Sequence, residues 1–321
     1  MNKKLFSVIC LLIVFLFCGC GKGSTASNQN TTGEREELPQ ETIVNTPQID
    51  PSLIGKTFAS GNYEYTVQED GTVYISGYIG NDTELTLPVE LDEYVVSGVA
   101  ANAFDNAESV SSLVVPGTIY MIGKEAFAGC VNLKKVTIEE GVQYIASRAF
   151  ANGTGYDFNS STVEEATIPD SIVRMGERPF GLRTNVGHVS NGLLYIGKFV
   201  VDVTESFDGH IIFEEDTRGI ADEAFLTWNP NVVEVTDTTV EIPEGVIYIG
   251  EAAFAGQDYI DYFKVPSTVV EIGSCALLYD EVNNGYSKYH SSDTQKIYGN
   301  AGTVAEMYAT ENGFNFVIVN N

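Results

Sequence analysis

The chain has 321 residues, of which 17 are Lys or Arg and 44 are Asp or Glu, so its formal net charge at pH 7 is −27. Nucleic-acid affinity depends on clustered Lys and Arg that displace counterions from phosphates, so this charge excludes nucleic acid as a partner. Hydrophobic residues make up 44% of the chain and include 17 Phe and 17 Tyr, which excludes a largely disordered protein.

Residues 1–19 predict a lipoprotein signal peptide. Lys3 and Lys4 precede an uncharged apolar run at 5–17, which has the length of a signal-peptide core and is too short to span a membrane. Cys20 follows the small residue Gly19, and this segment resembles the lipobox of bacterial lipoproteins. The resemblance implies that the Cys20 sulfur carries a diacylglyceryl group. Two or more acyl chains anchor a protein stably to a membrane.

Residues 20–52 are predicted to form a flexible tether. They are mainly Ser, Thr, Asn, Gln, Gly, Glu and Pro, so they cannot bury enough apolar surface to offset the entropy lost on ordering. A random coil of this length reaches roughly 30 Å from the membrane. Beyond the tether only Cys130 and Cys275 remain, and their wide separation along the chain predicts two free thiols.

The rest of the chain repeats. An Ala-Phe pair recurs, with Pro179-Phe180 and Ala276-Leu277 as variants, and an aliphatic residue always stands five positions before the Phe or Leu. Another seven positions earlier, a short segment of alternating apolar residues ends. The gap from each Phe to the next such segment varies in length. It is longest after Phe180, where we expect a protruding feature. Fixed inner spacings with one variable gap are what the stacked coils of a solenoid require. The aliphatic column comprises Val99, Ile122, Ile145, Met175, Ile220, Ile249 and Ile272, and the expected strand ends are Val115, Ile138, Ile168, Phe213, Ile242 and Val265.

The segments that lead to these strand ends alternate between apolar and polar residues, with a period of two. The pattern apolar-x-x-apolar-x-apolar occurs at 133–138, 163–168 and 260–265. Such alternation predicts strands whose apolar side chains point inward. The side chains expected on the open face are Lys135, Thr137, Glu165, Thr167, Tyr262 and Lys264.

The repeat unit, seen at 138–150 and 249–254, resembles the BspA-like leucine-rich repeat of bacterial surface proteins. The resemblance covers residues 54–321. It implies a repeat solenoid of about six to seven coils, with mostly short parallel β-strands, turns and short helical segments. It also implies a β-rich N-terminal cap at 53–98, a solenoid at 99–298 with a hairpin insertion near 188–212, and a C-terminal cap with a short helix at 299–321. Family members are surface-exposed or secreted, and several act in adhesion or binding. Together with the lipobox, the resemblance implies an exported, membrane-anchored protein at the cell surface.

One column of side chains directly precedes the aliphatic column and is predicted to form a continuous row along the stacked coils. Tyr and Arg supply much of the binding energy at interfaces. Tyr144, Arg174, Tyr248 and the strand-face residue Tyr262 are therefore the candidate ligand contacts. The alternative, that these residues only cover the solenoid edge and have no partner, stays open. The whole row comprises Met121, Tyr144, Arg174, Gly219, Tyr248 and Glu271.

No nucleophile-elbow, phosphate-loop, metalloprotease or EF-hand motif occurs, and His188, His210 and His290 are far apart in sequence. We therefore expect no catalytic residue, no cofactor and no metal. The sequence favours a lipid-anchored cell-surface protein that recognises a host or neighbouring-cell protein or glycan. Two alternatives stay open. One is an envelope-associated carbohydrate-processing enzyme or accessory, for which the many carboxylates could supply an acid pair; the other is a passive surface scaffold.

Overall fold

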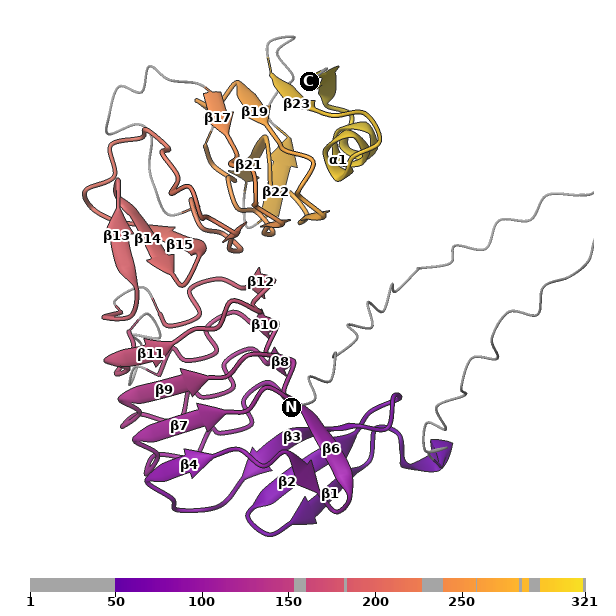
Figure 1. The fold of residues 1–321 in the computed structure, drawn as a ribbon, viewed down its shortest axis with the longest axis vertical. Coiled ribbons are helices and arrows are strands. Elements are labelled where there is room, and N and C mark those ends of the chain that lie inside the picture. The colour runs from indigo at the N-terminus through magenta and orange to yellow at the C-terminus, as the bar shows by residue number, and fades with distance from the viewer. Residues whose placement is uncertain are drawn as a thin grey trace, which may run out of the picture. The chain divides into compact units, whose positions relative to one another are not determined.

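The computed structural model describes residues 50–152, 160–181, 184–226, 239–257, 259–282, 285–288 and 295–319. They belong to one compact unit, Pro47–Asn321 (Figure 1). The predicted signal peptide, Cys20 and the tether up to residue 49 lie outside the described residues. Within the described part of the chain, no helix is both long and apolar enough to cross a membrane.

Two parallel sheets form from the alternating segments, and we call them long-strand sheets 1 and 2. In Figure 1 sheet 1 is the stack of four arrows at the lower left. The alternation is confirmed, because Val136 and Ile138 in β9 are buried while Lys135 is exposed. Sheet 1 contains β4 (Glu84–Thr86), β7 (Ser112–Val115), β9 (Lys135–Ile138) and β11 (Glu165–Thr167), and sheet 2 contains β17 (Thr239–Glu241), β19 (Tyr262–Lys264), β23 (Lys296–Gly299) and β24 (Asn315–Ile318).

The aliphatic column lies in two further sheets, which we call short-strand sheets 1 and 2 after their two-residue strands. Each of these strands ends on an aliphatic residue whose side chain points into the coil, and Ile122, Ile145 and Ile249 have no exposed surface. The parallel strands of sheet 1 are β6 (Tyr94–Val99), β8 (Met121–Ile122), β10 (Tyr144–Ile145) and β12 (Arg174–Met175), and those of sheet 2 are β16 (Gly219–Ile220), β18 (Tyr248–Ile249) and β20 (Glu271–Ile272).

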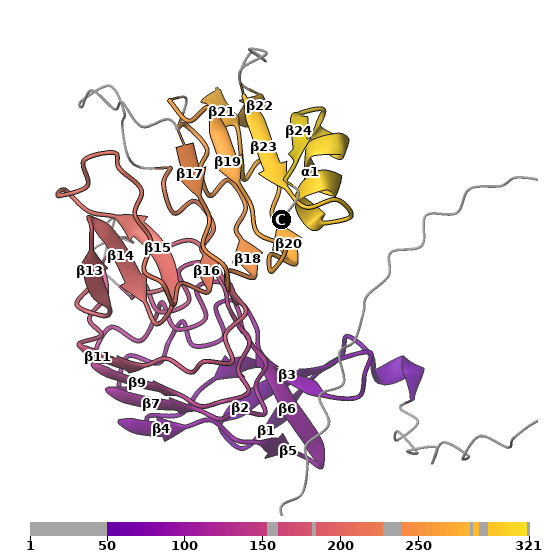
Figure 2. The same cartoon turned by 45° about the horizontal axis from the view of Figure 1, so that its top comes forward.

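Both short-strand sheets begin with a three-stranded antiparallel meander, shown most clearly for the second sheet in Figure 2. The first meander is β1 (Thr57–Ser60), β2 (Tyr63–Val67) and β3 (Val73–Tyr78), with β5 (Glu90–Leu91) paired to β6, and a 3-10 turn at Pro51–Leu53 precedes it. The second is β13 (His188–Ser190), β14 (Leu193–Ile196) and β15 (Phe199–Val203). The segment near 188–212 therefore begins a second stack of coils in the same way that the N-terminal strands begin the first. We call these two stacks the first and second half-solenoids.

The two meanders share details that a chance insertion would not produce. The register shifts directly before a buried tyrosine in both, at Tyr65 and at Tyr195. In both, an aromatic ring from the last meander strand covers a glycine in the first parallel strand. A Cβ added at Gly98 would stand 2.7 Å from the Tyr74 ring, and one at Gly219 would stand 2.2 Å from the Phe199 ring. Glycine is required at these positions because any side chain would displace the ring.

The recurring Phe side chains stack into a spine through each half-solenoid. Phe127 is completely buried between Phe104, with ring centroids 4.7 Å apart, and Phe150, at 5.2 Å. The variant Pro179-Phe180 keeps the stack, because Phe180 lies 4.7 Å from Phe150. In each coil the residue two positions before the Phe or Leu has a left-handed backbone, with φ between 42° and 58°: Asn102, Glu125, Arg148, Arg178, Glu223, Ala252 and Cys275.

The expectation of a strand ending at Phe213 is wrong. Residues 209–214 form no strand. Long-strand sheet 1 ends at β11, which precedes them in the chain, and long-strand sheet 2 begins at β17, which follows them, so neither sheet includes this coil. The buried side chains accordingly form two hydrophobic clusters, one centred on each half-solenoid. The helix α1 (Val304–Asn312) and β24 close the second half, and β21 (Tyr279–Val282) pairs with β22 (Gly285–Lys288).

Candidate functional site

The row of candidate contact residues follows the strand registers, with one break. Met121 pairs with Tyr144 and Tyr144 with Arg174 in short-strand sheet 1. Gly219 pairs with Tyr248 and Tyr248 with Glu271 in sheet 2. The predicted continuity is wrong between Arg174 and Gly219, because β12 and β16 lie near each other but belong to different sheets. The Asp222 N–H donates a hydrogen bond to the Met175 carbonyl, at 3.2 Å, across this break.

At this break the two sheet faces turn toward each other. The Arg174 guanidinium forms an ion pair with the Glu271 carboxylate, three strands further along the row. Three strand spacings in a flat sheet amount to about 14 Å, which exceeds the combined reach of the two side chains. Arg174 therefore crosses the face rather than following it, and 49% of its side chain remains exposed.

Two tyrosines from opposite sides of the break share this face. Tyr144, from β10, is half-buried, and Tyr248, from β18, is 7% exposed. The Tyr248 hydroxyl donates to Asp222 Oδ1 at 2.6 Å. Burial raises the pKa of both phenols, and the nearby Asp222 charge raises the pKa of each further.

Carboxylates surround the two rings. Asp222 accepts hydrogen bonds from the Tyr248 hydroxyl and from the Glu251 N–H, at 3.0 Å; burial nevertheless raises its pKa. Glu251 is exposed, and its carboxylate has no ion-pair partner among the described residues. The charges of Asp222, Glu271 and Glu251 all raise the pKa of Tyr144, so the three carboxylates lie near its phenol. We call this surface the junction face and define it by Tyr144, Arg174, Asp222, Tyr248, Glu251 and Glu271.

Asp222 and Glu251 do not belong to the row of candidate contact residues, but a second repeating position in the sequence marks them. Both stand two positions after the aliphatic column, where every coil from the second onward has a polar or charged residue. One residue separates this position from the end of the short strand, so the column runs close to the row. The column comprises Lys124, Ser147, Glu177, Asp222, Glu251 and Ser274.

Tyr262 lies apart from the junction face. It belongs to β19 in long-strand sheet 2, where it is half-buried and packs edge-to-face on Tyr298 with ring centroids 5.8 Å apart. Its neighbour Lys264 pairs with Glu241 at 3.5 Å across adjacent strands. The four candidate contacts therefore divide into three on one face and one on a different sheet.

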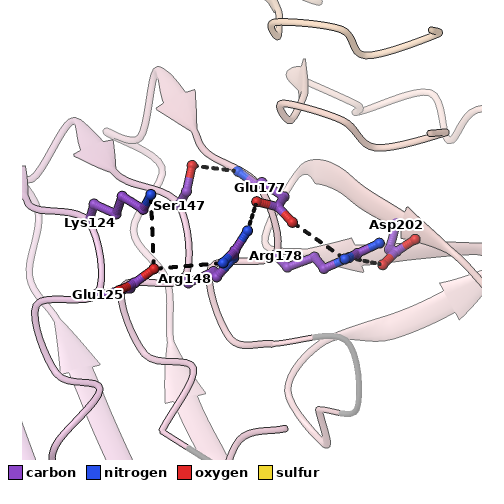
Figure 3. A network of polar contacts seen from close by, with 7 residues as sticks. All are labelled: Lys124, Glu125, Ser147, Arg148, Glu177, Arg178 and Asp202. Carbon is purple, nitrogen blue, oxygen red and sulfur yellow. Dashed lines mark hydrogen bonds and ion pairs between the residues drawn. The ribbon is translucent and has the colours of Figure 1, made fainter. Parts of the chain in front are cut away.

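A second polar feature runs along the left-handed turns (Figure 3). Arg148 lies between Glu125, at 3.7 Å, and Glu177, at 2.8 Å, and Arg178 continues the chain from Glu177, at 3.3 Å, to Asp202, at 3.1 Å. Lys124 and Ser147 complete the network in Figure 3. Because Asp202 comes from β15, this ladder ties the second meander to the first half-solenoid. Its ions already satisfy one another, so it is a stabilising feature of the fold.

An open groove of about 430 Å³ lies at the ends of the strands of long-strand sheet 2. Ile212, Pro243 and Pro266 contribute apolar surface, and Glu241 and Glu244 line it. Burial raises the pKa of two carboxyls elsewhere, Asp105 and Asp222. Among the described residues, neither of these carboxyls lines the groove, so this groove gives no support to the carbohydrate-processing alternative. No metal-ligand group of three or more His, Cys, Asp or Glu occurs in the described ranges.

The lone histidines and the thiols have ordinary surroundings. His188 stacks on Tyr195 at 5.3 Å and contacts both carboxylate oxygens of Glu214 at 3.1 Å, and His210 lies 3.2 Å from Asp208. His290 lies outside the described residues. The expectation of two unpaired thiols is confirmed for Cys130 and Cys275, and burial raises the pKa of Cys130 to about 12.

The family model of the BspA type leucine-rich repeat region matches six copies, at residues 97–229 and 232–284, which is more than half of the chain. The chain belongs to this leucine-rich-repeat family. BspA-type proteins are typically exposed at the bacterial surface. The matched ranges include both halves of the junction face and the second meander.

Several solved structures are similar to this BspA-type chain. A leucine-rich repeat protein from Bacteroides capillosus is 29% identical over 41% of this chain and 96% of its own, with a TM-score of 0.36. A leucine-rich cell surface protein from Faecalibacterium prausnitzii is 18% identical over 74% of this chain and 95% of its own, with a TM-score of 0.30. The pneumococcal vaccine antigen PcpA is 15% identical over 84% of this chain and 100% of its own, with a TM-score of 0.27. No curated protein matches the chain.

Proposed function

We propose that the protein is a lipid-anchored receptor of the bacterial surface that binds an external macromolecule at the junction face. The observation that carries this proposal is the convergence of Tyr144, Arg174 and Tyr248, from strands on both sides of the break. Tyr is among the residue types that supply much of the binding energy at interfaces. Half-buried Tyr144 belongs to this class, and Arg174 stands beside it in the adjacent strand.

Membership of a family of surface-exposed proteins supports the location. The sequence of residues 1–20 supports the anchor, which is a diacylglyceryl group on Cys20. A tether with a reach of roughly 30 Å would carry the folded unit beyond the lipid headgroups. The partner is a host or neighbouring-cell protein or glycan, and no step of this function requires catalysis.

Binding at the face is tested with the compact unit Pro47–Asn321, screened against extracellular-matrix proteins and glycans by surface plasmon resonance. Tyr144→Ala removes a ring from the junction face, while Tyr262→Ala removes one from long-strand sheet 2. We expect a saturable partner that the first variant loses and the second retains. A partner bound equally by both variants would place recognition elsewhere.

The anchor has its own test. Cys20→Ala removes the sulfur that accepts the lipid, so the protein should leave the membrane fraction. Cys18→Ala is the matched control, because it changes a neighbouring cysteine and leaves the modified position intact. Membrane retention of the Cys20→Ala protein would contradict the lipoprotein assignment without affecting the binding proposal.

A further inference from the structure

The junction face already holds a guanidinium group. Arg174 reaches across the break to Glu271, and it lies close enough to the half-buried Tyr144 for its charge to lower the pKa of that phenol against the opposing effects of burial and the carboxylates. A cation beside a tyrosine ring and a carboxylate is a favourable arrangement, because the ring quadrupole and the negative charge attract it together. The face is therefore chemically suited to a cation, and its own arginine already pairs with one of its carboxylates.

The face has more negative charge than Arg174 neutralises. Glu271 pairs with Arg174, which leaves the carboxylates of Asp222 and Glu251. Asp222 accepts hydrogen bonds from two neutral donors, the Tyr248 hydroxyl and the Glu251 backbone N–H. Among the described residues, neither Asp222 nor the exposed Glu251 has an ionic partner. Since neighbouring anions repel one another, an added cation would relieve this repulsion as well as form new contacts.

We propose that the occupant of the junction face is a segment of a partner protein that bears Arg or Lys. The partner's cationic group lies against the Tyr144 ring and the carboxylates of Glu251 and Glu271. This inference rests on the proposed function and commits it to a basic protein segment, since ordinary glycans have no comparable cation. Charge complementarity over the whole chain, with its net charge of −27, would also speed the encounter.

Arg174 has a specific role in the recognition of a cationic segment. For a cationic partner, Arg174 is an internal competitor for Glu271 rather than a contact. Arg174→Gln should therefore tighten binding, whereas Glu251→Gln should weaken it. A residue that only supported the fold would weaken binding when replaced, so the opposite signs of these two changes distinguish recognition from structural support.

The experiment uses the full chain in detergent and two fluorescent peptides of equal length, one of alternating Gly and Arg and one of alternating Gly and citrulline. Citrulline keeps the shape of arginine and lacks the charge. We expect saturable binding of the Gly-Arg peptide, at least about tenfold weaker binding of the citrulline peptide, and about a tenfold loss in Glu251→Gln, as for one charge-assisted hydrogen bond. Glu139→Gln, an equal change of charge at an exposed site that follows β9, is the control and should leave affinity unchanged.

Three results would overturn the inference. Equal binding of the two peptides would show that charge is not recognised, and absence of Gly-Arg binding would show that the face does not accept cations. An equal loss in Glu251→Gln and Glu139→Gln would assign binding to the net charge of the protein instead of this face. Capture of another partner that Tyr144→Ala abolishes, without Gly-Arg binding, would reject the cationic segment and leave the proposed function standing.

Discussion

Truncation of Phe127 tests the coil register most directly. The Phe127 side chain has no exposed surface and stacks on one ring at each side, with centroids 4.7 and 5.2 Å away. Phe→Ala in a close-packed core costs about 3–5 kcal/mol, because the transfer free energy is lost and a cavity remains. Two aromatic contacts, each contributing about 0.5–1.5 kcal/mol beyond burial, place Phe127→Ala in the upper part of that range.

This loss corresponds to a fall in the unfolding temperature of about 6–20 °C for a domain of this size. Calorimetry and urea unfolding of Pro47–Asn321 measure it. Phe58→Ala is the matched control, because Phe58 is 38% exposed and has one tilted contact, with Tyr65 at 5.8 Å. The control should change stability by less than about 1 kcal/mol. Two variants with the same unfolding temperature would refute the stacked spine.

Three further outcomes follow from particular contacts. Gly219→Ala should destabilise the protein by about 1–3 kcal/mol, because its Cβ would meet the Phe199 ring at 2.2 Å, and Phe199→Leu in the same chain should recover part of this loss in urea unfolding. Asp202→Ala removes the ion pair of 3.1 Å that joins Arg178 to β15 and leaves Arg178 paired only with Glu177 among the described residues, so it should raise hydrogen exchange across β13–β15 more than in the rest of the chain; uniform exchange would contradict the tie. Burial raises the pKa of Cys130 to about 12, so its thiolate is scarce at pH 8 and mass spectrometry should find it alkylated only after denaturation.

The spacing of apolar residues predicted most of the coil. Ile122 and Ile145 end short parallel strands, Phe127 lies in the spine, and Lys135 projects outward, all as the repeat indicates. These positions were predictable because every coil must bury the same column to stack on its neighbours. The substitution of Pro179 for Ala was harmless for the same reason, since the following Phe180 still fills the stack.

The turns and the break were not predictable from the spacing. The left-handed turn position holds Arg148 in one coil and Cys275 in another, with no glycine in any coil to mark it. Phe213 has the correct spacing to Ile220, yet it forms no strand. The spacing of residues does not show that β16 pairs with β15, the last strand of the second meander. This pairing depends on hydrogen bonds between segments that are distant in sequence.

The second meander is also what makes the junction face. In an uninterrupted parallel sheet, neighbouring members of the contact row stand one strand spacing apart and point in similar directions, so Arg174 could meet only its immediate neighbours. Because β15 pairs with β16, β12 remains an edge strand and the row begins again in a second sheet. Arg174 then contacts Glu271 across the break, and carboxylates that would have been spread along one row surround Tyr144 instead. A local restart of the repeat thus converts a line of separate side chains into a surface with converging charge, which a regular solenoid of the same composition would lack.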